Sequence, residues 1–334
     1  MGFGLRTRHL LLGALSLAAL AAVATTPQLL GRQVGAGFDG LGAATPAWLW
    51  LAATAFAAGI LSLAFAWRSA LTSCGGEVSR VDAASRYGAG SLAGALLPAK
   101  VNSAVRIALY ARTLPNEGRL WTSGGVASAI SAAHACWLAV LLAYAGASGV
   151  LPLWPLAALA LAVTAAVAAA VLTRNRKPRR QIAHALDAFR ALGRSPRAAA
   201  TLLGWTGLAM LARIGGATAI AAALGVHSPL GAALLVIPAV ELAGLLPLTP
   251  GNVGVTAAAV AFALRAHGVE TDLALTVGVA FNAVEAATSL AFGAASVLQL
   301  ATRLPRWAYA TAGACGIAAV AGAFSLTVLV PLAN

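Results

Sequence analysis

The segment Leu242-Ala-Gly-Leu-Leu-Pro-Leu-Thr-Pro-Gly-Asn-Val-Gly-Val255 gives the clearest indication of how this 334-residue chain folds. A related segment lies earlier in the chain, Leu92-Ala-Gly-Ala-Leu-Leu-Pro-Ala-Lys-Val-Asn-Ser-Ala-Val105. Both copies read Leu-Ala-Gly, then a proline that breaks a helix, then an asparagine and a second apolar run. Matches of Leu, Ala and Gly are common in this composition, so the shared Asn102 and Asn252 carry more weight. The pair, in register at one constant offset, predicts an internal repeat of a broken helix.

The composition around these segments is that of a membrane protein. Hydrophobic residues make up 60% of the chain and charged residues 9%, whereas a soluble domain carries about 25% charged residues. A soluble globular enzyme is therefore excluded. Cys74, Cys136 and Cys315 lie far apart, which argues against a disulfide framework, a zinc site or an iron–sulfur site.

Seven apolar runs are long enough to cross a bilayer, whose core of about 30 Å needs about 20 apolar residues per helix. We expect these transmembrane helices at Leu10–Thr26, Ala47–Trp67, Trp121–Tyr144, Leu153–Thr173, Ala198–Leu224, Leu273–Leu300 and Trp307–Leu329. The first run follows a basic segment and has a competing interpretation as a cleaved signal peptide, which would leave the later topology unchanged.

The distribution of the formal charge of +13 predicts the orientation. With the N-terminus inside, most Lys and Arg residues fall in or beside inside-facing segments, and only Arg32 and Arg265 fall outside. We therefore expect a multi-pass protein of the cytoplasmic (inner) membrane. The basic run 174–180 is interpreted as a topology-determining loop, with a patch for anionic lipid or nucleic acid as the alternative.

Two stretches, 87–112 and 229–267, are too broken for simple spans and too apolar for solvated loops. Such backbone is tolerated at membrane depth where protein or a watery cavity satisfies its polar groups, which suggests re-entrant hairpins. Three predicted spans separate the two stretches, so they would enter from opposite sides, as in an inverted repeat. The alternative is convergent low-complexity sequence in two loops.

The predicted fold class is an all-α polytopic membrane protein with about seven transmembrane helices and two re-entrant helical hairpins in an inverted repeat. We expect a single domain over residues 1–334. Its first repeat half covers about 47–150, a cytoplasmic basic loop 174–197, the second half about 198–300, and a final span 307–330.

The segments 245–255 and 96–106 resemble those of the lysylphosphatidylglycerol synthase transmembrane-region family, also called flippase-like membrane proteins. The Gly268-Val269 turn and the later helix with Asn282 and Glu285 add to the resemblance, which covers nearly the whole chain. Members usually have Gly-Glu where Ser103-Ala104 stand here, and commonly a Glu near Thr256. Roles that depend on those acids do not carry over.

The resemblance implies movement of a lipid, or a lipid-linked headgroup, between leaflets. Some relatives fuse this region to a cytoplasmic aminoacyltransferase domain, whereas only residues 330–334 follow the last predicted span here. We therefore expect the transport half alone, with no enzymatic activity and no cofactor.

Polar residues at membrane depth are the candidate substrate-binding residues, because an intramembrane charge usually faces a cavity or a partner. Cationic side chains would receive a lipid phosphate, and the acids would balance them or receive a cationic headgroup or a proton. The candidates are Lys100, Asn102, Arg106, Arg213, Glu241, Pro250, Gly251, Asn252, Asn282 and Glu285.

Each candidate has a structural alternative. Arg106 would lie at the interface if its hairpin is shallow, and Arg213 would form a structural ion pair with Glu241 or Glu285. Asn102 and Asn252 would cap the broken helices. His134 lies in a run of small residues, where helix packing is favoured over a proton relay.

Two rival functions remain open. A membrane-embedded phosphatase is disfavoured because 250–254 supplies neither Ser nor Arg and no acidic pair has metal-binding spacing, so we predict no metal site. A non-catalytic partner of a separately encoded lipid-modifying enzyme or glycosyltransferase would present surfaces rather than a cavity. The expected partners are membrane lipids and, for this second rival, such an enzyme, with no nucleic acid; oligomeric state, lipid identity and coupling are left open.

Overall fold

The computed structural model describes residues 44–96, 99–115, 118–147, 180–244 and 254–302, and within these ranges the regular structure is entirely helical. Four helices are long: α3 (Pro46–Ser73), α6 (Arg119–Ala147), α9 (Pro196–Ala223) and α12 (Thr271–Thr302). The shorter helices are α4 (Arg80–Leu96), α5 (Ala99–Ala111), α8 (Arg180–Arg194), α10 (Pro229–Gly244) and α11 (Val255–Ala266).

Local sequence signals explain several helix ends. Pro46 and Pro196 occupy the first position of α3 and α9. At this position the backbone N–H that proline lacks would have no partner within the helix. Ser195 caps α9 by accepting a hydrogen bond at its hydroxyl from the Ala198 N–H, at 3.3 Å. Gly75 follows the end of α3 with φ +82°, a conformation that favours glycine and turns the chain toward α4.

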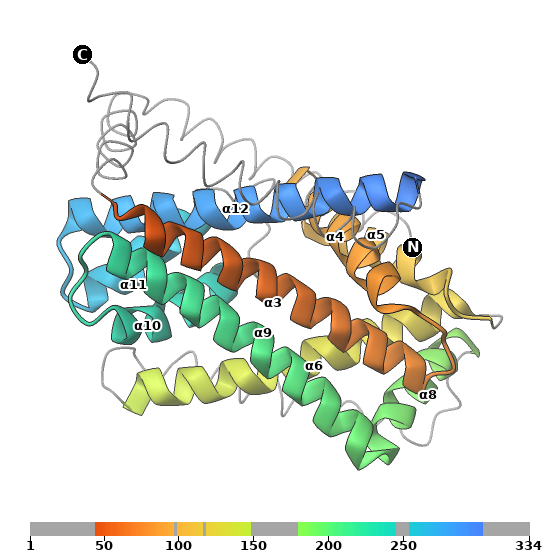
Figure 1. The fold of residues 1–334 in the computed structure, drawn as a ribbon. Helices are drawn as coiled ribbons and strands as arrows, with labels where there is room; N and C mark the ends of the chain where they lie inside the picture. The colour runs from red at the N-terminus through yellow and green to blue at the C-terminus, as the bar shows by residue number, and fades with distance from the viewer. Residues whose placement is uncertain (1–43, 97–98, 116–117, 148–179, 245–253, 303–334) are drawn as a thin grey trace, which may run out of the picture.

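The two helices α3 and α9 form an antiparallel pair at the centre of the bundle (Figure 1). The Thr45 N–H, at the start of α3, donates to the Ala223 carbonyl at the end of α9. Small residues allow close approach along the pair: a Cβ on Gly59 would lie 3.5 Å from the Ala209 carbonyl oxygen. Such packing of small residues is typical of helices that associate in membranes.

Each pair of short helices forms a hairpin at one end of this central pair. The α4–α5 hairpin contacts α12 and α6, whereas the α10–α11 hairpin contacts α9 and α12 (Figure 1). On α4, a Cβ on Gly88 would overlap Ser296 of α12, and a Cβ on Gly293 would lie 3.0 Å from the Gly88 carbonyl oxygen. Glycine at these two positions lets α4 and α12 pack with their backbones close together.

Two apolar clusters divide the interior. The cluster around α10, α11 and the start of α12 contains Phe56 and Phe281, whose rings meet edge to face at 5.3 Å. The cluster around α4, α5, α6 and α8 contains Trp67 and Tyr110, whose rings stack at 4.5 Å. Each hairpin therefore has its own apolar support.

The helix order repeats along the chain at the offset found in the sequence, the one that carries Asn102 onto Asn252. Shifting α3 by this repeat offset gives 196–223, which are the bounds of α9. The same shift brings α4 close to α10, and α6 close to α12. The two breaks expected from the sequence fall between α4 and α5 and between α10 and α11.

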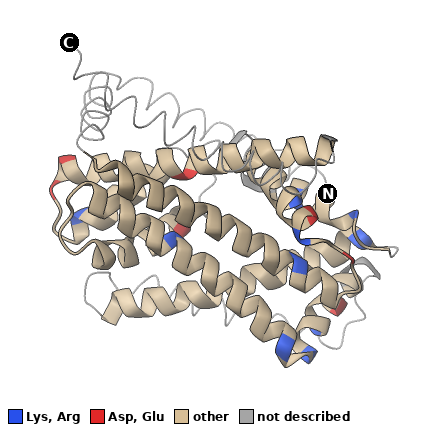
Figure 2. Ribbon diagram, viewed as in Figure 1, with Lys and Arg blue, Asp and Glu red and all other residues tan. Residues whose placement is uncertain are grey.

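Four of the seven predicted spans are confirmed as apolar helices long enough to cross a membrane: α3, α6, α9 and most of α12. Figure 2 shows charged residues gathered toward one end of the bundle, with few along its middle. The chain is therefore a multi-pass membrane protein. The spans predicted at 10–26, 153–173 and 307–329, and the basic run 174–179, lie outside the described residues.

Candidate functional site

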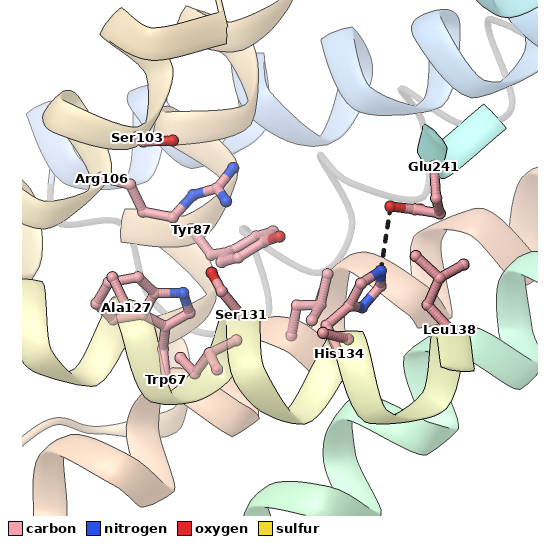
Figure 3. A pocket seen from close by; sticks show the side chains of 12 residues that line it. Trp67, Tyr87, Ser103, Arg106, Ala127, Ser131, His134, Leu138 and Glu241 are labelled. Atoms are coloured by element: carbon pink, nitrogen blue, oxygen red, sulfur yellow. Dashed lines mark ion pairs between the residues drawn. The ribbon is translucent and has the colours of Figure 1, made fainter. Parts of the chain in front are cut away.

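A cavity of about 360 Å³ lies between helices of the first half, and one residue of α10 also lines it (Figure 3). Its wall is mostly apolar, with polar groups toward either side. It is lined by Leu63 and Trp67 of α3, Tyr87 of α4, Ser103 and Arg106 of α5, Ala127, Ile130, Ser131, His134, Ala135 and Leu138 of α6, and Glu241 of α10. A mostly apolar cavity with a few convergent polar groups is typical of a ligand site.

Arg106 provides the positive charge of this cavity. Its guanidinium carbon lies 4.1 Å from the centroid of the Tyr87 ring, a cation–π contact between α5 and α4. A Cβ on Gly90 would lie 3.2 Å from Arg106 Nε, so glycine at that position leaves room for the arginine. Ser103, one turn earlier on α5, adds a hydroxyl to the same side of the cavity (Figure 3).

The hairpin that carries Arg106 is fixed to its neighbours by buried hydrogen bonds. The Tyr110 hydroxyl donates to the Ala83 carbonyl at 2.7 Å, which ties α5 to α4. The Ser123 hydroxyl donates to the Ile107 carbonyl at 3.0 Å, which ties α6 to α5. Together these bonds set the position of α5 and hence of Arg106.

Glu241 and His134 form the other polar side of the cavity (Figure 3). His134 Nε2 lies 3.2 Å from Glu241 Oε2 and joins α6 of the first half to α10 of the second. Arg213 donates two further hydrogen bonds next to this pair. Its Nη1 donates to Glu241 Oε1, and its Nη2 donates to Glu285 Oε1 at 2.7 Å. We call these four side chains, His134, Glu241, Arg213 and Glu285, the polar network.

The polar network is largely removed from solvent, and its arginine links three helices. The side chains of Arg213, Glu241 and Glu285 are 20, 19 and 29% exposed. Arg213 on α9 holds carboxylates of α10 and α12, and charges so enclosed are stable only when paired. The cavity thus has a cation on one side and a carboxylate, already bound by Arg213, on the other.

The structure brings some of the sequence-predicted residues together and not others. Arg106 and Glu241 both line the cavity, while Arg213 and Glu285 lie behind Glu241. The ion pair given as the alternative for Arg213 is confirmed, and it involves both acids. Asn282 lies one turn before Glu285 on α12, and the lining residues do not include it.

The remaining candidates lie at the two breaks. Lys100 and Asn102 both fall in the first turn of α5, which begins at Ala99. The backbone of Asn102 is helical, and the capping interpretation of its side chain stays a prediction. Pro250, Gly251 and Asn252 lie outside the described residues.

Sequence reasoning missed several cavity residues. His134 was assigned to packing, yet it contacts Glu241 on the cavity wall. Trp67, Tyr87 and Ser131 also line the cavity, although none of them is among the residues predicted from the sequence. One signal was available: Ser131 and His134 are three residues apart and so share one face of a helix. Within the described ranges no group of three His, Cys, Asp or Glu side chains is arranged to hold a metal ion.

Comparison with known families gives a match over most of the chain. Residues 10–293 match the family described as the lysylphosphatidylglycerol synthase TM region. The chain belongs to this family. The match covers both hairpins and every residue that lines the cavity. No curated protein matches the chain.

Proposed function

We propose that this protein moves a phosphate-bearing lipid between the leaflets of the membrane, as a flippase or related transporter. The observation that carries the proposal is the Arg106 guanidinium on the wall of an otherwise apolar cavity, next to Tyr87 and Ser103. A guanidinium presents parallel N–H donors that match phosphate oxygens, and the apolar wall suits the adjoining part of a lipid. Membership of the family supports the same function.

We further propose that the two halves form an inverted repeat with two re-entrant hairpins. The coincidence of the α3 and α9 bounds at the repeat offset supports this, as does the antiparallel packing of these helices. Helices related by a two-fold axis in the membrane plane run in opposite directions, and folds of this kind place their sites where broken helices meet.

We propose that the basic end of the bundle faces the cytoplasm, in the inner membrane, with the N-terminus inside. Arginines cluster at the α4 start, the α5 end, the α6 start and in α8 (Figure 2). Helix α8 has the strongest amphipathic character of the described helices and leaves Leu186 and Phe189 exposed, as expected of a helix lying at a membrane interface.

Reconstitution into vesicles tests the proposed function. The purified protein is placed in vesicles of phosphatidylcholine and phosphatidylglycerol that contain a trace of fluorescent phosphatidylglycerol. Dithionite added outside bleaches only the dye in the outer leaflet, so loss of protected dye reports translocation. We expect the wild type to translocate the lipid and Arg106→Gln to lose most of this activity.

A matched arginine provides the control. Arg190 lies exposed on α8, away from the cavity lining, so Arg190→Gln should translocate at the wild-type rate. Equal rates in the wild type and Arg106→Gln would refute the assignment of the site. Absence of translocation for every phospholipid class tested would refute the flippase proposal and favour a non-catalytic partner of a lipid-modifying enzyme.

A further inference from the structure

The net charge of the polar network depends on whether His134 carries a second proton. Arg213 contributes one positive charge, Glu241 and Glu285 contribute two negative charges, and neutral His134 contributes none. The sum is −1 with His134 neutral and 0 with His134 protonated. A single proton on the imidazole would therefore neutralise a charge cluster at membrane depth, where net charge is costly.

The proton-binding side chains line the cavity, and binding of an anion in the cavity favours their protonation. His134 and Glu241 both line the cavity, as does Arg106 on the opposite side. Before a lipid binds, Arg106 (+1) and the network (−1) sum to zero without a proton. When a phosphate monoanion binds at Arg106, the total falls to −1, and one proton on His134 returns it to zero. Binding of an anionic lipid therefore favours binding of a proton.

Among the residues that the structure describes, the other titratable and charged groups around His134 leave this balance intact. From the helices packed against α6, the described charged or titratable side chains on the cavity wall are Arg106 of α5 and Glu241 of α10, with Tyr87 of α4 across the cavity. Helix α3 contributes Leu63 and Trp67. Helix α8 contacts α6 at Gly125, more than two turns from His134. Arg213 and Glu285 act through Glu241.

We propose that His134 and Glu241 form a proton-binding site, and that the protein carries one proton with each anionic lipid that it moves. In this step hydronium from the aqueous phase on one side gives a proton to the unprotonated ring nitrogen of His134 and becomes water. The same proton passes to water on the other side when the lipid leaves the cavity. The His134–Glu241 link becomes an ion pair between the halves. The inference rests on the proposed lipid transport and extends it with a driving force.

The test measures the final distribution of lipid between leaflets. Vesicles as above are given a pH difference of about one unit, with the electrical potential clamped by potassium and valinomycin. One proton per lipid biases the leaflet ratio of fluorescent phosphatidylglycerol by about tenfold, because one pH unit corresponds to a tenfold equilibrium factor. Protein-free vesicles correct for passive movement.

The variants distinguish the protonation of His134 from its hydrogen bond to Glu241. His134→Gln keeps an N–H donor for Glu241 but cannot titrate, so any lipid that this variant still moves should end equally divided between the leaflets. Glu241→Gln should lose the tenfold bias as well. His227→Gln is the matched control, because His227 is exposed in the turn between α9 and α10, and it should keep the full bias.

A second readout uses the wild type alone, in case the variants are unstable. A pH dye trapped in the vesicles should report acidification when phosphatidylglycerol is added to the outer leaflet. Translocation with equal leaflets at every gradient, and no acidification, would overturn proton coupling while leaving lipid transport standing. A tenfold bias retained in His134→Gln would overturn the site. No translocation at all would instead refute the proposed function.

Discussion

The first and second halves of this protein have the same order of helices, but the side chains at equivalent positions differ in chemistry. Leu63 and Ala135 line the open cavity of the first half, and their counterparts at the repeat offset are Arg213 and Glu285, which form an ion pair. Tyr87 supports Arg106, whereas its counterpart Ile237 is fully buried in apolar packing. At the positions that the offset relates, an ion pair is present in the second half and an open cavity in the first.

This difference shows that the positions of the helices and the chemistry of the site depend on different residues. Proline, glycine and apolar length determine where the helices begin and end in both halves. The side chains at a few matched positions then decide whether a half encloses a cavity or a salt bridge. The predictions below exchange or remove these side chains, from the largest expected effect to the smallest.

Replacing Arg213 by the residue at the equivalent position of the first half should cause the largest loss of stability. Arg213→Leu introduces the residue found at position 63 and leaves Glu241 and Glu285 enclosed without their cation. Breaking an enclosed pair in this way costs about 3–5 kcal/mol. Thermal unfolding in detergent, followed by tryptophan fluorescence, measures the effect.

A compensated variant separates charge from packing. Arg213→Leu combined with Glu241→Gln and Glu285→Ala removes the stranded carboxylates, so it should recover much of the lost stability. Wild-type stability in the single variant would show that the ion pairs are not needed to hold α9, α10 and α12 together.

Adding a methyl group where the halves meet should have the next largest effect. A Cβ in Gly88→Ala would overlap Ser296 on α12, and overpacking of this kind costs about 1–3 kcal/mol. Gly124→Ala on α6 is the control, because a Cβ there meets nothing within 4 Å. The control should match or exceed wild-type stability in the same unfolding assay, since alanine favours helix. Equal stability of the two variants would contradict the close approach of α4 and α12.

Replacing Tyr87 with its counterpart should weaken the cavity with less effect on the fold. Tyr87→Ile removes the ring beneath Arg106, a contact worth about 0.5–2 kcal/mol, so lipid translocation should slow by about two- to thirtyfold. Tyr87→Phe keeps the ring and should retain most of the rate. Equal slowing in both variants would assign the effect to the hydroxyl instead.

The two helix caps of the central pair offer the smallest contrast. Ser195 accepts a hydrogen bond from the first turn of α9, whereas its counterpart Thr45 makes no such bond at the start of α3. Ser195→Ala should therefore lower the free energy of unfolding by about 1 kcal/mol, and Thr45→Ala should leave it almost unchanged. Chemical denaturation of the two variants side by side measures the difference, and an equal loss in both would contradict it.

The sequence was sufficient to predict the features that depend on local signals. Apolar length located α3, α6, α9 and α12, and the prolines near 98 and 247 marked the breaks in the two hairpins. The offset between Asn102 and Asn252 predicted a repeat, and the bounds of α3 and α9 agree with that offset. The scarcity of charge at membrane depth led to Arg213, Glu241 and Glu285, since each needs a partner.

The cavity could not be predicted in this way. It depends on how α4, α5 and α6 pack, which brings Tyr87, Arg106 and His134 together from three helices. His134 resembled a packing residue because its neighbours in sequence are small, and its partner Glu241 lies in the other half of the chain. No one-dimensional spacing links those two positions.

The most direct test of a lipid-binding cavity in the first half measures how a water-soluble reagent labels equivalent positions in the two halves. Ser131 lines the cavity, and Phe281, its counterpart at the repeat offset, is buried in the apolar cluster. Ser131→Cys and Phe281→Cys, each in a chain with Cys74, Cys136 and Cys315 replaced by serine, are treated with a water-soluble maleimide. We predict that Ser131→Cys reacts, that phosphatidylglycerol protects it while diacylglycerol does not, and that Phe281→Cys stays unreactive. Equal reactivity at both positions, or labelling of Ser131→Cys that phosphatidylglycerol leaves unchanged, would contradict a lipid-binding cavity in the first half.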